Sequence, residues 1–518
     1  MANKRASSAP NPLRAAHDSR KRSKASELWF RKCNHGEALF RAYLAAQSVV
    51  PAAEAAAFWA ALRRPLPITW WVHPRAPAEF ARRLRASAHA APAPWAAGAG
   101  VWQASLERRA LGAGGEAAAL GALLAEGVAA GALSRQEAVS MLPVLALRVA
   151  PGSRCLDVCA SPGSKTQQLL AAVAGGASEA RRVGMVVAND AHPQRVAALL
   201  DALGRHGRSA SELARLVVTC HRGEALPAPA RPFGKRRGGG AGFDRVLCDV
   251  PCSGDGTIRK DASVLPRWTP GVGNALHATQ LAIAWRGLEL LRVGGLLCYS
   301  TCSLNPIEDE AVVAALLGRA AGAVELEAWP ADVLPALRRR AGLRSWRVAD
   351  HADADDDDGD EEVALRWHAS FDAARAAGVA HAVPTMWPPA AADAARLRLE
   401  RCSRLLPHDQ DTGGFFVALL RKHAPLGGGG GGGEAAADGE LPPQLLQPLP
   451  PAEAEALAGR AGLRRGAARR RLLRPEGARG DRAVRVAPPG FAAFAPGALR
   501  VVSAGVPLGA AEAGERGV

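Results

Sequence analysis

Three pairs of cysteines in this 518-residue chain share the spacing Cys-x-x-x-Cys. They are Cys155 and Cys159, Cys248 and Cys252, and Cys298 and Cys302. The first cysteine of each pair lies inside an apolar run typical of a strand, where a small hydrophobic residue is expected. Along a strand this spacing separates the two sulfurs by more than about 10 Å, so we expect no metal site from these pairs.

Cys252 and Cys302 differ from the other cysteines because each follows its strand and lies in a polar loop. The first is in DVPCSGDG and the second in STCSLNPIE. In the second loop, Asn305 as N-cap, Pro306 at the first helical position and Glu308 at capping-box spacing predict a helix start. A thiol that faces a helix start has a lowered pKa and more thiolate. The two loops therefore predict nucleophilic chemistry.

A turn of small residues follows the first of these strands and leads into a helix. It consists of Cys159, Ala160, Ser161, Pro162, Gly163, Ser164 and Lys165. Such a turn lets backbone approach a ligand, and the helix start offers N–H groups to an anionic group. It is neither a P-loop nor a G-x-G-x-x-G fingerprint. The next strand ends in Asp190, where an acid can bind ribose hydroxyls. These features predict a nucleoside-bearing cofactor with an anionic end.

Short apolar strands alternate with helical stretches between residues 148 and 317. The expected strands are 154–159, 184–189, 216–220, 245–249 and 296–300. This alternation predicts an α/β fold with a parallel sheet covered on both faces. Ligands of such sheets lie at the carboxyl ends of the strands, where the turn and both cysteine loops are expected to meet.

The remaining segments predict flanking regions around a catalytic domain at 146–424. The predicted division of the rest is a disordered basic arm at 1–26, a small α/β N-terminal region at 27–145, a Gly/Pro-rich linker at 425–458 and a basic, largely irregular segment at 459–518. Within the catalytic domain, the acidic run 353–362 predicts a solvated insertion. In the N-terminal region, Trp70 and Trp71 are expected on opposite faces of a strand, so at least one should be in the core.

Composition favours a nucleic-acid partner. Lys and Arg number 65 against 49 Asp and Glu, a formal charge of +16, although Arg, Ala, Gly and Pro are abundant throughout. Nine cysteines without an apolar leader predict reduced thiols in a compartment inside the cell. The longest apolar stretch, 117–133, is interrupted by Glu126 and too weakly hydrophobic for a membrane span. We expect a monomer with no membrane partner.

Together these segments resemble the Sun-domain RNA (cytosine-5) methyltransferases, in particular the eukaryotic branch that methylates tRNA. The matching strings are LSRQEAVSMLP, CLDVCASPGSKT, VVANDAHPQR, FDRVLCDVPCSGDGTIRK, CYSTCSLNPIEDEAVV, PTMWPP and ERCSRLLPHDQDTGGFFVALL. The resemblance covers most of residues 37–423. LRVVSAGV, near the end, is similar to the opening of the family's C-terminal RNA-binding region, so the resemblance implies a shortened form of that region at 459–518.

The resemblance implies a Rossmann-like class I methyltransferase domain with a mostly parallel seven-stranded sheet and S-adenosyl-L-methionine as cofactor. The cofactor would lie over the turn from Cys159 to Lys165, with its ribose on Asp190, and Lys165 would also belong to the catalytic set. Cys302 would add to C6 of cytosine, and Asp249, beside the cofactor, would bind the protonated pyrimidine edge. Cys252 would help to release the product. The expected substrate is RNA, specifically tRNA.

One segment departs from the family pattern. After the third strand the family carries an Asp that contacts the adenine amino group, whereas this chain reads Cys220-His221-Arg222-Gly223-Glu224. Glu224 is the nearest acid and is the candidate for that contact.

Two questions stay open at the level of sequence. A catalytically idle RNA-binding or assembly factor on the same fold is the alternative to an active enzyme. The basic run 20–24 and the branch resemblance favour the nucleus, including the nucleolus, whereas the Arg/Ser-rich start also resembles an organellar transit peptide.

Overall fold

The computed structural model describes residues 35–112, 114–175, 184–205, 210–228, 242–351 and 364–427, together with short strands between 446 and 507. The predicted basic arm, the acidic run and most of the predicted linker and basic C-terminal segment lie outside the described residues. No helix in these described ranges is long and apolar enough to cross a membrane.

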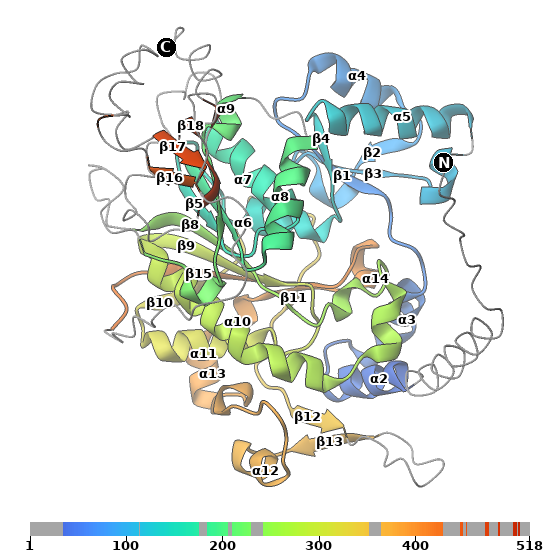
Figure 1. The fold of residues 1–518 in the computed structure, drawn as a ribbon. Helices are drawn as coiled ribbons and strands as arrows, with labels where there is room; N and C mark the ends of the chain where they lie inside the picture. The colour runs from blue at the N-terminus through green and yellow to red at the C-terminus, as the bar shows by residue number, and fades with distance from the viewer. Residues whose placement is uncertain are drawn as a thin grey trace, which may run out of the picture.

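A ten-stranded sheet forms the centre of the molecule (Figure 1). Its parallel strands are β5 (Arg154–Asp157), β6 (Met185–Asp190), β7 (Leu216–Cys220), β8 (Phe243–Asp249) and β9 (Leu291–Thr301). The other strands are β10 (Val324–Glu327), β11 (Arg340–Ala341), β14 (Ser403–Leu405), β15 (Phe415–Lys422) and β19 (Val501–Ala504). The order is β11-β14-β15-β9-β8-β5-β6-β7-β19, with β10 also paired to β15. The predicted Rossmann-like methyltransferase fold is confirmed, and β11, β14 and β19 extend its seven strands.

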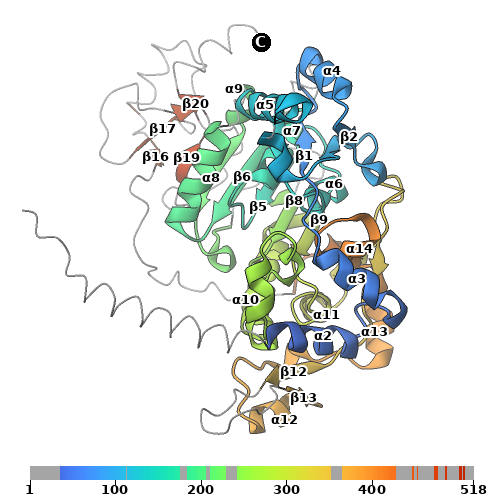
Figure 2. The same cartoon turned by 90° about the vertical axis from the view of Figure 1, so that its right-hand side faces the viewer.

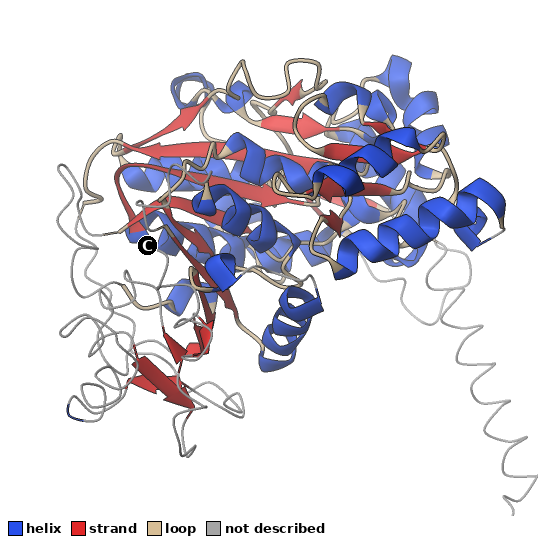
Figure 3. Cartoon of the chain, turned by 90° about the horizontal axis from the view of Figure 1, so that it is seen from above, coloured by secondary structure: helices blue, strands red, loops and turns tan. Residues whose placement is uncertain are grey.

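The sheet separates two apolar cores because neighbouring residues of a strand point to opposite faces. In β5, Cys155 faces one core and Leu156 the other; in β8, Leu247 and Cys248 divide in the same way. The first core is covered by α6 (Leu142–Ala146), α7 (Ser164–Ala174) and α8 (Pro193–Arg205), and the second by α10 (Pro270–Leu290) and α11 (Glu310–Ala320). Figure 3 shows helices on both sides of the strands. The strand cysteines are fully buried, which confirms their interpretation as core residues.

A second, antiparallel sheet lies in the N-terminal region, in the order β2-β3-β1-β4. Its elements are β1 (Thr69–Val72), β2 (Ala90–Pro92), β3 (Val101–Ala104) and β4 (Leu133–Arg135), flanked by α4 (Ala78–Ala86) and α5 (Gly115–Ala129). Trp70 and Trp71 lie on opposite faces, as expected, and both are buried: Trp70 packs within this region and Trp71 against the catalytic core. Neither ring is exposed for stacking on bases.

The first two helices pack on the catalytic region instead of on the N-terminal sheet. They are α2 (Gly36–Ala46) and α3 (Ala55–Leu62), and α2 lies close to one end of α10 in both Figure 1 and Figure 2. The hydroxyl of Tyr43 donates to Oδ1 of Asn305 at 2.7 Å, and Nε2 of Gln47 donates to the carbonyl of Arg347 at 2.6 Å. The predicted domain boundary at residue 145 stays a prediction.

Smaller elements surround this framework. They are α9 (Ala210–Leu213), α12 (Phe371–Ala376), α13 (Ala391–Leu397), α14 (Pro407–Gln410), β12 (Val348–His351), β13 (Leu365–His368), β16 (Leu446–Pro448), β17 (Leu472–Pro475), β18 (Arg485–Val486) and β20 (Val506–Pro507). Strand β16, from the predicted linker, and β17, β18 and β20, from the C-terminal segment that was expected to be largely irregular, form a separate four-stranded sheet. From the same segment, β19 pairs antiparallel with β7 at the edge of the central sheet.

Candidate active site

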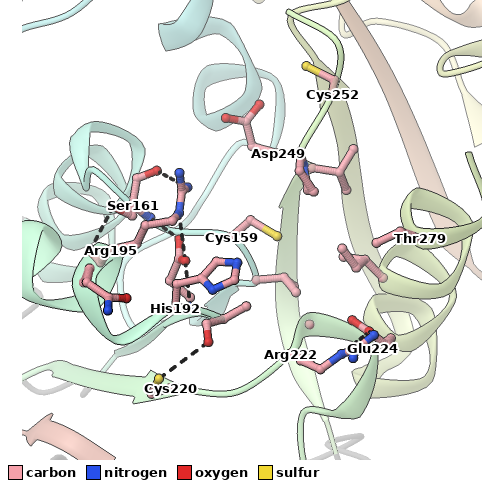
Figure 4. Close-up of a pocket in the computed structure, with 18 of the residues that line it drawn as sticks. Cys159, Ser161, His192, Arg195, Cys220, Arg222, Glu224, Asp249, Cys252 and Thr279 are labelled. Carbon is pink, nitrogen blue, oxygen red and sulfur yellow. Dashed lines mark hydrogen bonds and ion pairs between the residues drawn. The ribbon is translucent and has the colours of Figure 1, made fainter. Parts of the chain in front are cut away.

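A cavity of about 960 Å³ opens at the carboxyl ends of β5 to β9. The predicted site residues that line it are Cys159, Ser161, Asp190, Glu224, Asp249, Cys252 and Cys302. Figure 4 shows Asp249 and Cys252 at one end of this cavity and Arg222 with Glu224 at the other. We call these the cysteine end and the acidic end. Arg195 and Arg222 also line the cavity, although the sequence did not single them out as site residues.

The two loop cysteines meet at the cysteine end. Strands β8 and β9 are parallel neighbours, with Asp249 opposite Ser300, so the loops that follow them lie side by side. The Sγ atoms of Cys252 and Cys302 are 3.2 Å apart. The hydrogen bond with Cys302, together with burial, raises the pKa of Cys252 well above its usual value. Cys252 is therefore held as a protonated thiol beside the second sulfur.

Asp249 and Lys165 form an ion pair next to these sulfurs. Nζ of Lys165 lies 2.6 Å from Oδ2 of Asp249, and the hydroxyl of Ser300 donates to Oδ1 at 2.7 Å. Burial lowers the pKa of Lys165, whereas the Asp249 carboxylate and, to a smaller degree, the Cys302 sulfur raise it. The pKa of Lys165 is raised overall. The lysine is therefore a fixed positive charge that faces both the carboxylate and Cys302.

Asp157, at the end of β5, is an acid that the sequence did not place in the site. Its Oδ2 accepts a hydrogen bond from the hydroxyl of Thr166 at 2.7 Å, whereas Oδ1 is buried and has no partner among the described residues. Burial raises the pKa of Asp157 to about 7.

Two backbone N–H groups of the small-residue turn are already hydrogen-bonded within the protein. The N–H of Ala160 donates to the carbonyl of Asn189 at 2.7 Å, and the N–H of Ser161 donates to Oδ2 of Asp190 at 3.1 Å. Gly163 has φ +106°, and a Cβ there would lie 2.7 Å from a methyl carbon of Leu199, so the close approach of α7 and α8 requires glycine. Of the turn residues, Cys159 and Ser161 line the cavity; Ala160, Pro162, Gly163, Ser164 and Lys165 do not.

Two ion pairs border the acidic end. Nε of Arg195 lies 2.9 Å from Oδ1 of Asp190, and Nη2 of Arg195 donates to the carbonyl of Ser161 at 3.0 Å. Nη2 of Arg222 lies 2.6 Å from Oε1 of Glu224. Asp190 is almost fully buried, whereas more than half of each arginine side chain is exposed. The sequence offers one signal for this role of Arg195: it lies near the start of a helix, five residues after Asp190.

The predicted helix start at Asn305 is wrong. Helix α11 begins at Glu310, and the residues before it form a turn in which Oδ1 of Asn305 accepts from the N–H of Ile307 at 3.0 Å. Glu308 does not cap this helix, because its carboxylate accepts hydrogen bonds from Ser253 in the other cysteine loop. Long-range hydrogen bonds have displaced the local capping pattern. The helix-start argument for a reactive Cys302 thiolate therefore does not hold.

Part of this chain is similar to known methyltransferases. Residues 144–353 match the family model described as 16S rRNA methyltransferase RsmB/F. The multisite-specific tRNA:(cytosine-C(5))-methyltransferase trm4b of Schizosaccharomyces pombe is 40% identical over 323 residues, which are 57% of this chain and 43% of the relative. The multisite-specific tRNA:(cytosine-C(5))-methyltransferase of Saccharomyces cerevisiae is 40% identical over 296 residues, 57% of this chain and 39% of the relative. The chain spans about two fifths of the length of these relatives.

Solved structures with a similar course of the chain come from Pyrococcus horikoshii. A methyltransferase homolog protein aligns with 22% identity and a TM-score of 0.45, covering 72% of this chain and 92% of its own. NSun6, solved with SFG, aligns with 16% identity and a TM-score of 0.48, covering 74% of this chain and 98% of its own.

Proposed function

We propose that this chain, whose residues 144–353 match the family model described as 16S rRNA methyltransferase RsmB/F, methylates C5 of cytosine in tRNA. The observation that carries this proposal is the pair of sulfurs 3.2 Å apart beside an Asp–Lys ion pair. A protonated thiol, a second thiol that can attack, and a carboxylate for the pyrimidine edge are the groups that this reaction requires.

In this proposal Cys302 supplies the nucleophile. Its thiolate adds to C6 of cytosine, and the electrons of the C5–C6 double bond then attack the methyl group through C5. Loss of the C5 proton to water restores the double bond and expels the Cys302 thiolate. Cys252 remains a protonated thiol within hydrogen-bonding distance of the departing sulfur.

Asp249 and Lys165 orient and polarise the base. The carboxylate of Asp249 is held by Ser300 and Lys165 and lines the cavity next to the sulfurs. It can accept a hydrogen bond from protonated N3 or from the amino group of cytosine. A proton held at N3 draws electrons from the ring and makes C6 a better acceptor for the thiolate.

The cavity fits S-adenosyl-L-methionine, which supplies the methyl group when it is bound. The chemistry of the donor set supports this fit, because Asp190 offers a carboxylate to ribose hydroxyls and Glu224 offers a carboxylate to an adenine amino group. Both acids line the cavity, and Glu224 lies at the end opposite Asp249 and Cys252 (Figure 4). Arg195 would have to share or release Asp190 when a ribose binds there.

The choice of tRNA rests on the relatives and on charge. The Schizosaccharomyces pombe and Saccharomyces cerevisiae relatives are named as tRNA cytosine methyltransferases, whereas the family description and a Klebsiella pneumoniae relative name ribosomal RNA. The net charge of +16 favours a polyanionic substrate.

The decisive experiment is methyl transfer from radiolabelled S-adenosylmethionine to tRNA and, in parallel, to rRNA. Bisulfite sequencing of both RNAs would locate the products. We expect 5-methylcytosine in tRNA. Label only in rRNA would reject tRNA as the substrate. RNA binding with no label in either RNA would support an idle RNA-binding factor instead.

A further inference from the structure

One fully buried carboxylate ties the two cysteine loops together. Oε1 of Glu308 accepts hydrogen bonds from the backbone N–H of Ser253 at 2.8 Å and from Nε2 of Gln280 at 3.0 Å. Oε2 accepts from the hydroxyl of Ser253 at 2.5 Å and from that of Ser303 at 2.7 Å. Each of the two serines directly follows one of the site cysteines. Glu308 therefore fixes the distance between the loops.

The two cysteines depend on this tie to different degrees. Cys302 directly follows β9, which is hydrogen-bonded to β8 on one side and β15 on the other. Cys252 lies beyond the end of β8, outside any helix or strand. The carbonyl of Pro251, the residue before Cys252, accepts a hydrogen bond from Nε2 of Gln280 at 2.9 Å. Ser253, the residue after Cys252, donates its backbone N–H to Glu308. Both neighbours of Cys252 are therefore held in place.

We propose that Glu308 is a positioning residue that holds the Cys252 thiol against Cys302 and so governs the release of the methylated product. The inference rests on the proposed function. When the C5 proton passes to water, its bonding electrons re-form the C5–C6 double bond and the sulfur–C6 bond breaks toward Cys302. The Cys252 S–H can donate a hydrogen bond to the departing sulfur only while the loops are held together. Addition to C6 depends instead on Cys302, whose place is set by the sheet.

The test is the Glu308→Ala variant, incubated with tRNA and S-adenosylmethionine and analysed on a denaturing gel. We expect a slow-migrating protein–RNA band that disappears in Glu308→Ala/Cys302→Ala. Multiple turnover should fall by about 10- to 100-fold, mainly in kcat, while binding of S-adenosylhomocysteine changes less than about twofold. Adding Glu308→Ala to Cys252→Ala should increase neither the band nor the loss of turnover, because both changes remove the same contact.

Two matched variants separate positioning from general damage to the loop. In Glu308→Gln the amide oxygen can still accept from the Ser253 N–H, and the amide nitrogen can donate to both serine hydroxyls, so we expect turnover near that of the wild type and no band. Thr301→Val, at the end of β9, removes two buried hydrogen bonds of the Thr301 hydroxyl, one to Asp309 at 2.6 Å and one from the N–H of Ser303 at 3.2 Å, and leaves those of Glu308 in place. It should lower thermal stability without trapping RNA.

A folded Glu308→Ala protein that loses turnover without a trapped band would overturn the inference, as would a band in Thr301→Val. If Glu308→Ala does not fold, Ser253→Ala/Ser303→Ala removes the hydroxyl ties, and absence of a band there would overturn it. Failure of the proposed function looks different. In that case the wild type transfers no methyl group and Cys252→Ala traps no RNA. A band in Cys252→Ala alone would reject only the role of Glu308.

Discussion

The cysteine end and the acidic end of the cavity are held by different kinds of interaction. At the cysteine end, a fully buried Glu308 accepts four hydrogen bonds, and the N–H of Gly256 donates to the carbonyl of Cys302 at 2.9 Å. At the acidic end, Asp190 and Glu224 are paired with arginines whose side chains are more than half exposed. The cysteine loops are held by buried hydrogen bonds, whereas each acid of the acidic end is paired with an arginine that is open to water.

The difference in energy explains why each end suits its task. A hydrogen bond to a buried charged acceptor stabilises by about 1.5–3 kcal/mol, and its loss leaves an unsatisfied group. An exposed ion pair contributes about 0–1 kcal/mol, so a ligand can displace the arginine at little cost. The cavity therefore combines a rigid end for covalent chemistry with an exchangeable end for binding.

The largest effect should come from removing the nucleophile. Cys302→Ala should lower methyl transfer by at least about 1,000-fold, because no other group can form the covalent adduct at C6. Binding of S-adenosylhomocysteine, measured by calorimetry, should persist because the acidic end is unchanged. Turnover like that of the wild type would end this mechanism.

Removing the Cys252 sulfur tests whether the two cysteines have distinct roles. The Cys252→Ala protein should still add to C6 of cytosine and methylate C5, but it should release the product slowly. A protein–RNA adduct through Cys302 should therefore accumulate and be visible on a denaturing gel. The adduct should vanish in Cys252→Ala/Cys302→Ala. Trapping in Cys302→Ala alone would reverse the roles. No trapping in any variant would leave Cys252 as a residue that only fills space in its loop.

A pair of variants sharpens the description of the acidic end. Asp190→Asn should weaken binding of S-adenosylhomocysteine by about 10- to 100-fold, the loss expected for a hydrogen bond to a charged acceptor. Arg195→Met removes only an exposed partner and should leave affinity unchanged or up to about fivefold tighter. Calorimetry of both proteins measures the contrast. A tenfold weakening in Arg195→Met would instead show that the arginine itself holds the ligand.

The smallest effect concerns stability and pH. Burial raises the pKa of Asp157 to about 7, so the folded chain keeps a proton that the unfolded chain has already lost above about pH 4. Stability from this group is present at low pH and is lost as the pH rises toward 7, by up to about 1.4 kcal/mol per pH unit.

Asp157→Asn should therefore make the fall in urea stability between pH 5 and 7 shallower. Some slope should remain, because burial also raises the pKa of Asp255 to about 7. Tryptophan fluorescence during urea unfolding gives the free energy at each pH. A slope equal to that of the wild type would contradict the shifted pKa of Asp157.

The sequence predicts the five parallel strands of the ten-stranded sheet because their signals are local. Apolar runs bounded by loops located β5 to β9 to within a few residues, and the parallel order then placed Asp190, Asp249 and both loop cysteines at one edge. The predicted helix start failed because Asn305 and Glu308 are bonded to Tyr43 and Ser253, which lie far away in sequence. Local capping rules cannot include such partners. Arg195 was missed for a related reason, since helical spacing alone does not show which side chain bends back to an acid.

Strand β19 has a consequence for the behaviour of the chain in solution. It pairs with β7, which would otherwise be the outer strand of the central sheet. An uncovered strand of that kind presents a row of free N–H and C=O groups to other molecules, and β7 is entirely buried and apolar apart from one threonine. By pairing with β7, β19 moves the edge of the central sheet to a strand of four residues, and short edge strands are one way in which proteins limit strand pairing between copies.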